Sequence, residues 1–171
     1  MARAETPLPV QVEDCERALP EEDAPAASDE QGRPVVGLAT RLNSRTIDLR
    51  SKLNKAIFLI KDGVTDLFTS YLRERGFVST HTAKLLGSAT EGGASVFKVK
   101  YFEREAYLAQ SPQFYKQMLI AARFRRVMEI GPVFRAENSN TGRHLTEFTG
   151  LDLEMALAKD YHEVVDLLEV S

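Results

Sequence analysis

The sequence predicts an α+β fold in which an antiparallel β-sheet is flanked by helices. Three patterns predict it: a long amphipathic helix over residues 51–75, a strand–turn–strand pattern over residues 96–109, and two longer apolar strands, 127–134 and 145–157, around a polar loop. A helix that starts near Pro112 separates the two strand pairs. Strands joined in succession by short turns pair antiparallel, and this order excludes a doubly wound sheet. The chain also lacks the glycine-rich sequence of a P-loop.

The first 40 residues differ in composition from the rest. They hold nine acidic and three basic side chains, whereas the whole chain has a net charge of −3, so residues 41–171 carry about +3. Most of the prolines also lie here, and such segments do not form a packed core. We therefore expect residues 1–40 to be a flexible acidic hinge or linker and residues 41–171 to form one domain with a core. The small positive charge permits nucleic-acid binding without predicting it.

The single cysteine, Cys15, excludes a disulfide framework and a cysteine metal cluster, as is typical of a reducing compartment. We expect it to be an exposed thiol without a redox role. No apolar run approaches the ~20 residues that span a bilayer, and the N-terminus has no secretory signal pattern. The sequence therefore predicts a cytoplasmic protein with no membrane partner.

The clearest element is the helix over residues 51–75. Ser51 is its expected N-cap, and Gly76 is its expected stop. Three apolar residues lie off the main apolar face: Phe58, Leu59 and Leu72. They are either partly buried under a neighbouring loop or part of a second contact surface such as a subunit interface. The main face consists of Leu53, Ile57, Ile60, Val64, Leu67 and Tyr71.

Shorter elements follow this helix. A short strand is expected over residues 77–81, a flexible loop over 87–95, and strands over 96–101 and 106–109. The helix that begins at Pro112 should reach about residue 123, with an inward face that contains Phe114, Met118 and one of two alanines, Ala121 or Ala122.

A final helix is expected after Asp160. This residue is the predicted cap, and Glu163 is expected to complete a capping box.

Two polar segments flank the loop between the long strands, and they are the most informative part of the sequence. Phe134-Arg135-Ala136-Glu137 precedes the loop, and Arg143-His144-Leu145-Thr146-Glu147-Phe148 follows it. An arginine presents a planar fork of donors to phosphate oxygens, and a phenylalanine offers a flat face on which a base can stack. The segments therefore indicate a nucleotide site without a glycine-rich cradle.

These two segments resemble motif 2 of the class II aminoacyl-tRNA synthetases. Further segments resemble the aspartyl branch of that class, most closely the eukaryotic cytoplasmic type: Thr90–Gly93, Tyr107–Gln117, Ile130–Glu137 and Thr146–Met155. The resemblance runs from about Arg41 to the end of the chain, and several motifs in the same order make it specific. It implies that residues 41–171 are the N-terminal part of a class II synthetase catalytic domain behind a hinge.

The resemblance also implies a reaction, that of an aspartate–tRNA ligase. L-aspartate is activated with ATP and Mg²⁺ to aspartyl-adenylate and then transferred to tRNA(Asp) in translation. Arg135 is implied to bind the α-phosphate as the catalytic residue, Glu137 to accept a hydrogen bond from the adenine amino group, and Phe148 to stack on adenine. Arg143 and His144 are implied to approach the β- and γ-phosphates.

The amino-acid half of the site follows from the same resemblance. Lys116 is implied to pair with the side-chain carboxylate of aspartate, while Gln113 and Glu91 hold its amino group. A lysine suits a carboxylate ligand, and a carboxylate suits an ammonium ligand. Ser139 and Thr141 are implied to contact the acceptor end of the tRNA.

Departures from the family pattern bear on activity and on assembly. The third motif of the family and the acidic ligands of Mg²⁺ are expected beyond residue 171, so we expect no metal site within the chain and little activity from it alone. A homodimer is expected through the helix 51–75 and the following strand, where Ala83 stands in place of the usual proline and weakens the contact.

Two alternatives remain open at this point. One is an asparaginyl enzyme, or a ligase that charges both tRNAs, although Lys116 favours aspartate because asparagine needs no lysine partner. The other is a truncated, non-catalytic paralogue that acts as a binding or regulatory module.

Overall fold

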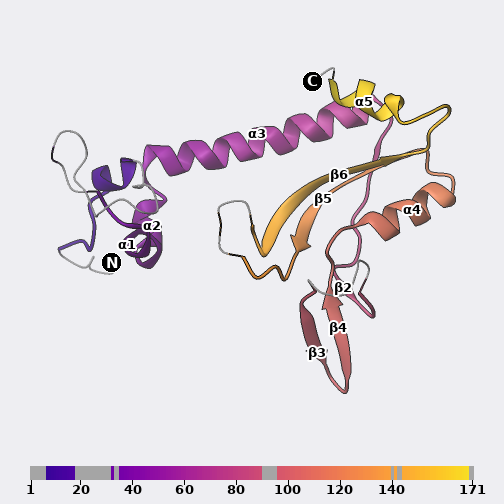
Figure 1. Cartoon of the computed structure of the whole chain (residues 1–171). Coiled ribbons are helices and arrows are strands. Elements are labelled where there is room, and N and C mark those ends of the chain that lie inside the picture. The colour runs from indigo at the N-terminus through magenta and orange to yellow at the C-terminus, as the bar shows by residue number, and fades with distance from the viewer. Residues whose placement is uncertain are drawn as a thin grey trace, which may run out of the picture. The chain divides into compact units, whose positions relative to one another are not determined.

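The computed structural model describes residues 7–17, 32, 35–89, 96–139, 141 and 144–169. The chain divides into two compact units, 1–64 and 65–171, which are described separately. The elements follow one another in this order, and Figure 1 labels all of them except η1 and β1: η1 Glu13–Glu16, α1 Leu38–Asn43, α2 Arg45–Asp48, α3 Lys52–Glu74, β1 Val78–Ser79, β2 Leu85–Leu86, β3 Lys98–Tyr101, β4 Arg104–Leu108, α4 Gln113–Ala121, β5 Arg126–Phe134, β6 Glu147–Met155 and α5 His162–Glu169. No described helix combines the length and apolar character needed to span a bilayer.

The long helix α3 has the ends that the sequence predicts. The amide of Asn54 donates to Ser51 Oγ (3.3 Å), which confirms Ser51 as the N-cap. At the other end Gly76 has φ +80°, and the amides of Gly76 and Phe77 donate to the carbonyls of Arg73 and Leu72. This is a Schellman motif, whose left-handed residue is least costly when it is glycine.

In the first unit, the segment 7–17 contacts a buried ion pair between Arg41 and Asp48. Arg41 donates to the carbonyls of Val36 and Arg17, and its guanidinium lies 4.0 Å from the buried carboxylate of Asp48. Cys15 is buried, so the expectation of an exposed thiol was wrong. Burial raises the pKa of this thiol, and the charge of Asp48 raises it further. The extent of a flexible linker over residues 1–40 stays a prediction.

The second unit contains two three-stranded sheets. The first has the strand order β1-β5-β6, and the second has the order β2-β4-β3. β5 and β6 pair antiparallel over nine residues, from Arg126↔Met155 to Phe134↔Glu147, and the second sheet is antiparallel throughout. The α+β prediction is confirmed, with one difference in detail. β1 pairs parallel with β5 because no tight turn joins them: the second sheet and α4 lie between them in the chain.

The core of the second unit lies where the end of α3 meets β5. Leu72 is 1% exposed and packs with Phe77 and Met128. The side chains packed around these three are Phe68, Tyr71, Leu153, Met155 and Leu167. Leu72 is thus the buried residue of α3, under a strand rather than a loop. By contrast, several residues of the predicted apolar face and its flank are exposed: Leu53, Ile57, Phe58, Leu59, Ile60, Val64 and Leu67.

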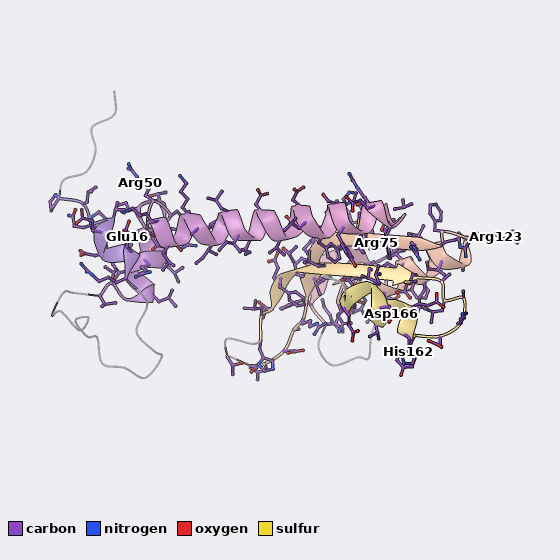
Figure 2. The ribbon with its side chains drawn as sticks, turned by 90° about the horizontal axis from the view of Figure 1, so that it is seen from above. Glu16, Arg50, Arg75, Arg123, His162 and Asp166 are labelled. Carbon is purple, nitrogen blue, oxygen red and sulfur yellow. The ribbon has the colours of Figure 1, made fainter. Side chains whose placement is uncertain are left out.

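Polar contacts tie the same end of α3 to its neighbours. The Arg75 guanidinium lies 3.5 Å from the centroid of the Tyr71 ring, and the Arg75 carbonyl accepts a hydrogen bond from Arg126 at the start of β5. The Tyr71 hydroxyl donates to the carbonyl of Leu167 in α5 (2.5 Å). Figure 2 shows Arg75 at this end of α3, beside the strands.

Helix α4 turns a different face inward from the one predicted. Phe114 and Met118 are 59% and 53% exposed, whereas Lys116 is buried. The expectation of an apolar inward face was therefore wrong. The reason is chemical, because the surface of β6 that α4 meets carries carboxylates.

The cap of α5 also differs in detail from the predicted capping box. Asp160 Oδ1 accepts from the His162 amide (2.9 Å), while the Glu163 carboxylate accepts from the amides of Lys159 (2.6 Å) and Ala158 (3.0 Å). Hydrogen bonds from the amides of Lys159 and Ala158 lower the pKa of Glu163.

Candidate active site

One face of the β5–β6 hairpin carries the polar side chains of the candidate site. Successive side chains of a strand point to opposite faces, and directly paired residues share a face. The nine-residue register therefore places one set together, which we call the site face: Val127, Glu129, Gly131 and Val133 of β5 with Phe148, Gly150, Asp152 and Glu154 of β6. The opposite face carries Met128 and Leu153, which pack against α3.

One end of the site face opens into a small cavity of about 280 Å³. Its lining residues are Arg135, Glu137, His144, Leu145 and Phe148. The Arg135 guanidinium carbon lies 5.3 Å from the centroid of the Phe148 ring, and His144 Nε2 lies 3.9 Å from Glu137 Oε2. The structure thus brings together four of the five residues predicted for the nucleotide. The fifth, Arg143, lies outside the described residues.

Backbone hydrogen bonds position this end. The Phe134 amide donates to the carbonyl of Ala109, and the Arg135 amide donates to the carbonyl of Thr146 (2.9 Å), one step beyond the last paired residues of the hairpin. Arg135 is therefore held at the rim of the cavity and is exposed. A guanidinium, a carboxylate and an aromatic face around one cavity can bind a phosphate, an amino group and a planar base.

Lys116 lies over the other end of the site face. It is 2% exposed, and its Nζ lies 3.0 Å from Asp152 Oδ1, 3.2 Å from the Leu153 carbonyl oxygen and 3.5 Å from Glu154 Oε2. Gln113 joins the cluster, because its Nε2 donates to Glu154 Oε2 (3.1 Å). The structure thus brings Gln113 and Lys116 into one cluster, and their binding of aspartate stays a prediction.

The loop residues of the prediction are only partly described. Glu91 lies outside the described residues. Ser139 and Thr141 are both exposed, and the Thr141 hydroxyl lies 2.6 Å from His144 Nδ1. The roles of all these residues stay predictions.

Sequence reasoning missed Asp152 and Glu154, the two carboxylates that hold Lys116. A signal was present, because they stand two residues apart in a strand and so share the face of Phe148. Their charges outnumber the single ammonium of Lys116, which leaves this cluster with a net negative charge.

A second ion pair on the site face was missed as well. Glu129 is buried, and its Oε1 accepts from the Thr82 amide (3.2 Å), the Thr82 hydroxyl (3.0 Å) and Lys84 Nζ (2.5 Å). The signal for it was a glutamate in the middle of an otherwise apolar strand.

The described residues do not fit a magnesium site. No group of three or more histidine, cysteine, aspartate or glutamate side chains within the described ranges is placed to hold a metal ion. The carboxylates of the site face instead lie against the lysine ammonium groups of Lys84 and Lys116.

Comparison with known proteins identifies relatives of this chain. Residues 37–171 match the family described as tRNA synthetases class II (D, K and N). The chain is 53% identical over 163 residues to the cytoplasmic aspartate–tRNA ligase of Homo sapiens, covering 95% of this chain and 31% of that protein. It is 52% identical over 161 residues to the Caenorhabditis elegans protein of the same name, covering 94% of this chain and 30% of that one.

A solved structure shows the same fold. The crystal structure of a putative aspartyl-tRNA synthetase from Leishmania major Friedlin superposes with a TM-score of 0.81 at 45% identity, covering 95% of this chain and 29% of that one. The chain thus spans about a third of the length of the proteins that it resembles.

Proposed function

Because the chain belongs to the class II tRNA synthetases (D, K and N), we propose that it carries the motif 2 part of the aspartate-activating site of an aspartate–tRNA ligase. The observation that carries the proposal is the site face, which has a cavity lined by an arginine, a glutamate and a phenylalanine at one end and a buried lysine among carboxylates at the other. Relatives that are named cytoplasmic aspartate–tRNA ligase support it, and with it a role in the cytoplasm.

In the proposed reaction, an α-carboxylate oxygen of L-aspartate attacks the α-phosphorus of ATP. The bond from that phosphorus to the bridging oxygen breaks, and pyrophosphate leaves. Arg135 would bind the α-phosphate, and Phe148 and Glu137 would hold adenine by stacking and by a hydrogen bond to its amino group. These groups act mainly by positioning the two reactants and by balancing charge. ATP is expected to carry Mg²⁺, and the described residues include no group of ligating side chains that would hold the ion.

The amino-acid half follows from the Lys116 cluster. The ammonium of Lys116 would pair with the side-chain carboxylate of aspartate, and Gln113 with Glu91 would hold the amino group. Lys116 already has three oxygen neighbours, so a substrate carboxylate must replace one of them; the contact with Glu154, at 3.5 Å, is the longest. A carboxylate released in this way suits the substrate's ammonium group. The neutral amide of asparagine would not be a matched partner.

Two further contacts belong to the proposal. Ser139 and Thr141, which are both exposed, would meet the acceptor end of tRNA(Asp). A homodimer would form through α3 and the strand that follows it, supported by the exposed apolar side chains of that helix, such as Ile60 and Leu67.

The proposal is tested by calorimetric binding of a non-hydrolysable aspartyl-adenylate analogue, aspartyl-sulfamoyl adenosine, with its asparaginyl counterpart as the comparison. Arg135→Ala should weaken binding of the aspartyl analogue by roughly 10- to 100-fold, because one charge-assisted hydrogen-bonding group is lost. Lys98→Ala, at an exposed lysine of β3, is the matched control and should bind as the unaltered chain does. Failure of the unaltered chain to bind either analogue would contradict the proposal, and preference for the asparaginyl analogue would favour the asparaginyl alternative.

A further inference from the structure

The ion pair between Lys84 and Glu129 lies between the two halves of the proposed site. Glu129 pairs directly with Asp152 across the hairpin, so both stand on the site face. Lys84 comes from the segment after β1, and its Nζ lies over Gly131, since a Cβ added there would be 3.6 Å from the Nζ. Gly131 in turn pairs with Gly150, the residue between Phe148 and Asp152 on this face.

The two paired glycines add no side chains of their own to the middle of the site face, and the side chains of their neighbours lean toward them: Glu129 and Lys84 at Gly131, and Asp152 and Val133 at Gly150. A Cβ at Gly150 would lie 2.9 Å from Asp152 Oδ2, so a larger residue would displace that carboxylate. At about 3.3 Å per residue, Phe148 and Asp152 are roughly 13 Å apart along the strand. That interval separates the residue proposed for adenine from the residues proposed for aspartate. The ribose and the phosphate that link them would therefore pass the level of the two glycines, where Lys84 lies.

Among the described residues, Lys84 keeps one N–H donor without an acceptor. An ammonium group has three N–H donors, and in the described part of the chain its Nζ has two hydrogen-bond acceptors, Glu129 Oε1 and Thr82 Oγ1 (3.1 Å). Its side chain keeps 20% exposure, whereas that of Glu129 keeps 2%. The carboxylate is thus buried as an anchor, whereas the Lys84 side chain keeps some contact with solvent.

Stability does not explain why an ion pair stands here. A buried pair of opposite charges costs desolvation that its attraction often fails to recover, and an apolar pair of similar volume is commonly as stable. A fixed cation does, however, suit a place where two anions must approach each other. In the proposed reaction the α-carboxylate of aspartate meets the α-phosphate of ATP at this point, and their repulsion opposes the attack.

We infer that Lys84 is a further substrate-binding residue, which donates its remaining N–H to the α-carboxylate of the amino acid where that carboxylate joins the phosphate. Glu129 and Thr82 are positioning residues that hold the ammonium over Gly131. This inference rests on the proposed function and adds one binding residue to it. Lys84 would recognise the α-carboxylate, which reacts, whereas Lys116 would recognise the side-chain carboxylate.

The experiment compares two variants, both of which lack the ion pair between Lys84 and Glu129. Glu129→Gln removes the anchor charge but keeps the ammonium, and the double variant Lys84→Gln, Glu129→Gln removes both while leaving two amides that can hydrogen-bond. The probes are L-aspartate and its α-amide, which keeps the ammonium group and the side-chain carboxylate but lacks the α-carboxylate charge. Binding is measured by NMR titration, and the folding of each variant is checked in the same spectra.

The affinity for L-aspartate should fall roughly 10- to 100-fold from the single to the double variant, as expected for the loss of a charge-assisted hydrogen bond. The affinity for the α-amide should change by no more than about twofold, since it offers no charge to Lys84. Equal changes for both probes, or no change for either, would overturn the inference alone. If L-aspartate does not bind the unaltered chain, the proposed function falls and the inference falls with it.

Discussion

Replacement of Lys116 by methionine should destabilise the protein more than any exposed charge change. The ammonium is almost fully buried, and the side chains of Asp152 and Glu154 are only 32% and 25% exposed. Methionine keeps the length of the side chain but leaves both carboxylates without their cation. Breaking a buried pair in this way costs about 3–5 kcal/mol. We expect the lower end, about 3 kcal/mol, because both carboxylates retain some contact with water.

The control is Lys98→Met. Lys98 forms a 3.3 Å ion pair with Glu105, but the two side chains are 63% and 62% exposed, so its loss should cost about 0–1 kcal/mol. The assay is urea unfolding followed by circular dichroism, with thermal unfolding beside it. At about 2–4 °C per kcal/mol, Lys116→Met should lower the melting temperature by roughly 6–12 °C. A difference between the two variants of less than about 1 kcal/mol would refute the reasoning that Lys116 is bound in a buried charge cluster.

Two further predictions concern the fold. Leu72→Ala should cost about 2–5 kcal/mol because it empties the contact between α3 and β5, whereas Leu67→Ala, at an exposed position of the same helix, should change the unfolding free energy by less than about 0.5 kcal/mol. Equal effects would show that the core lies elsewhere. Glu163 stabilises the start of α5 when ionised, because amide hydrogen bonds lower its pKa in the folded state. That contribution is present above the ordinary carboxyl pKa and is lost as the pH falls through the lowered value. Between about pH 6 and 3, the melting temperature of Glu163→Gln should therefore fall less than that of the unaltered chain. An equal fall in both proteins would contradict this role of Glu163.

The elements of this fold were predictable because the signals for them are local. Ser51 and Gly76 mark the ends of α3, where each acts on backbone groups within a few residues. The long strands around a polar loop predicted the β5–β6 hairpin in the same way. Four of the residues predicted to bind the nucleotide lie just before or just after the loop between β5 and β6. Pairing of the two strands is enough to bring them together, so the sequence could group them.

The rest of the site could not be predicted because it depends on distant segments. Lys116 was placed on a helix whose apolar residues were expected to face inward, yet it is the lysine that is buried and Phe114 that is exposed. Periodicity indicates which residues share a side of a helix. It does not indicate what that side will meet, and here it meets the carboxylates of β6.

By itself, the sequence determined the class of the fold, most of its helices and strands, and the motif order that indicates a class II synthetase. Each of these depends on short stretches of the chain, where residue spacing and local backbone preference are enough to predict the structure. Only the tertiary structure decided which charges are buried and which partner each one has. The parallel pairing of β1 with β5 brings the segment that carries Lys84 toward Glu129, and the packing of α4 carries Lys116 to Asp152. A buried charge is tolerated only where a partner is held within a few ångströms, and that partner comes here from residues 36 to 45 positions away along the chain.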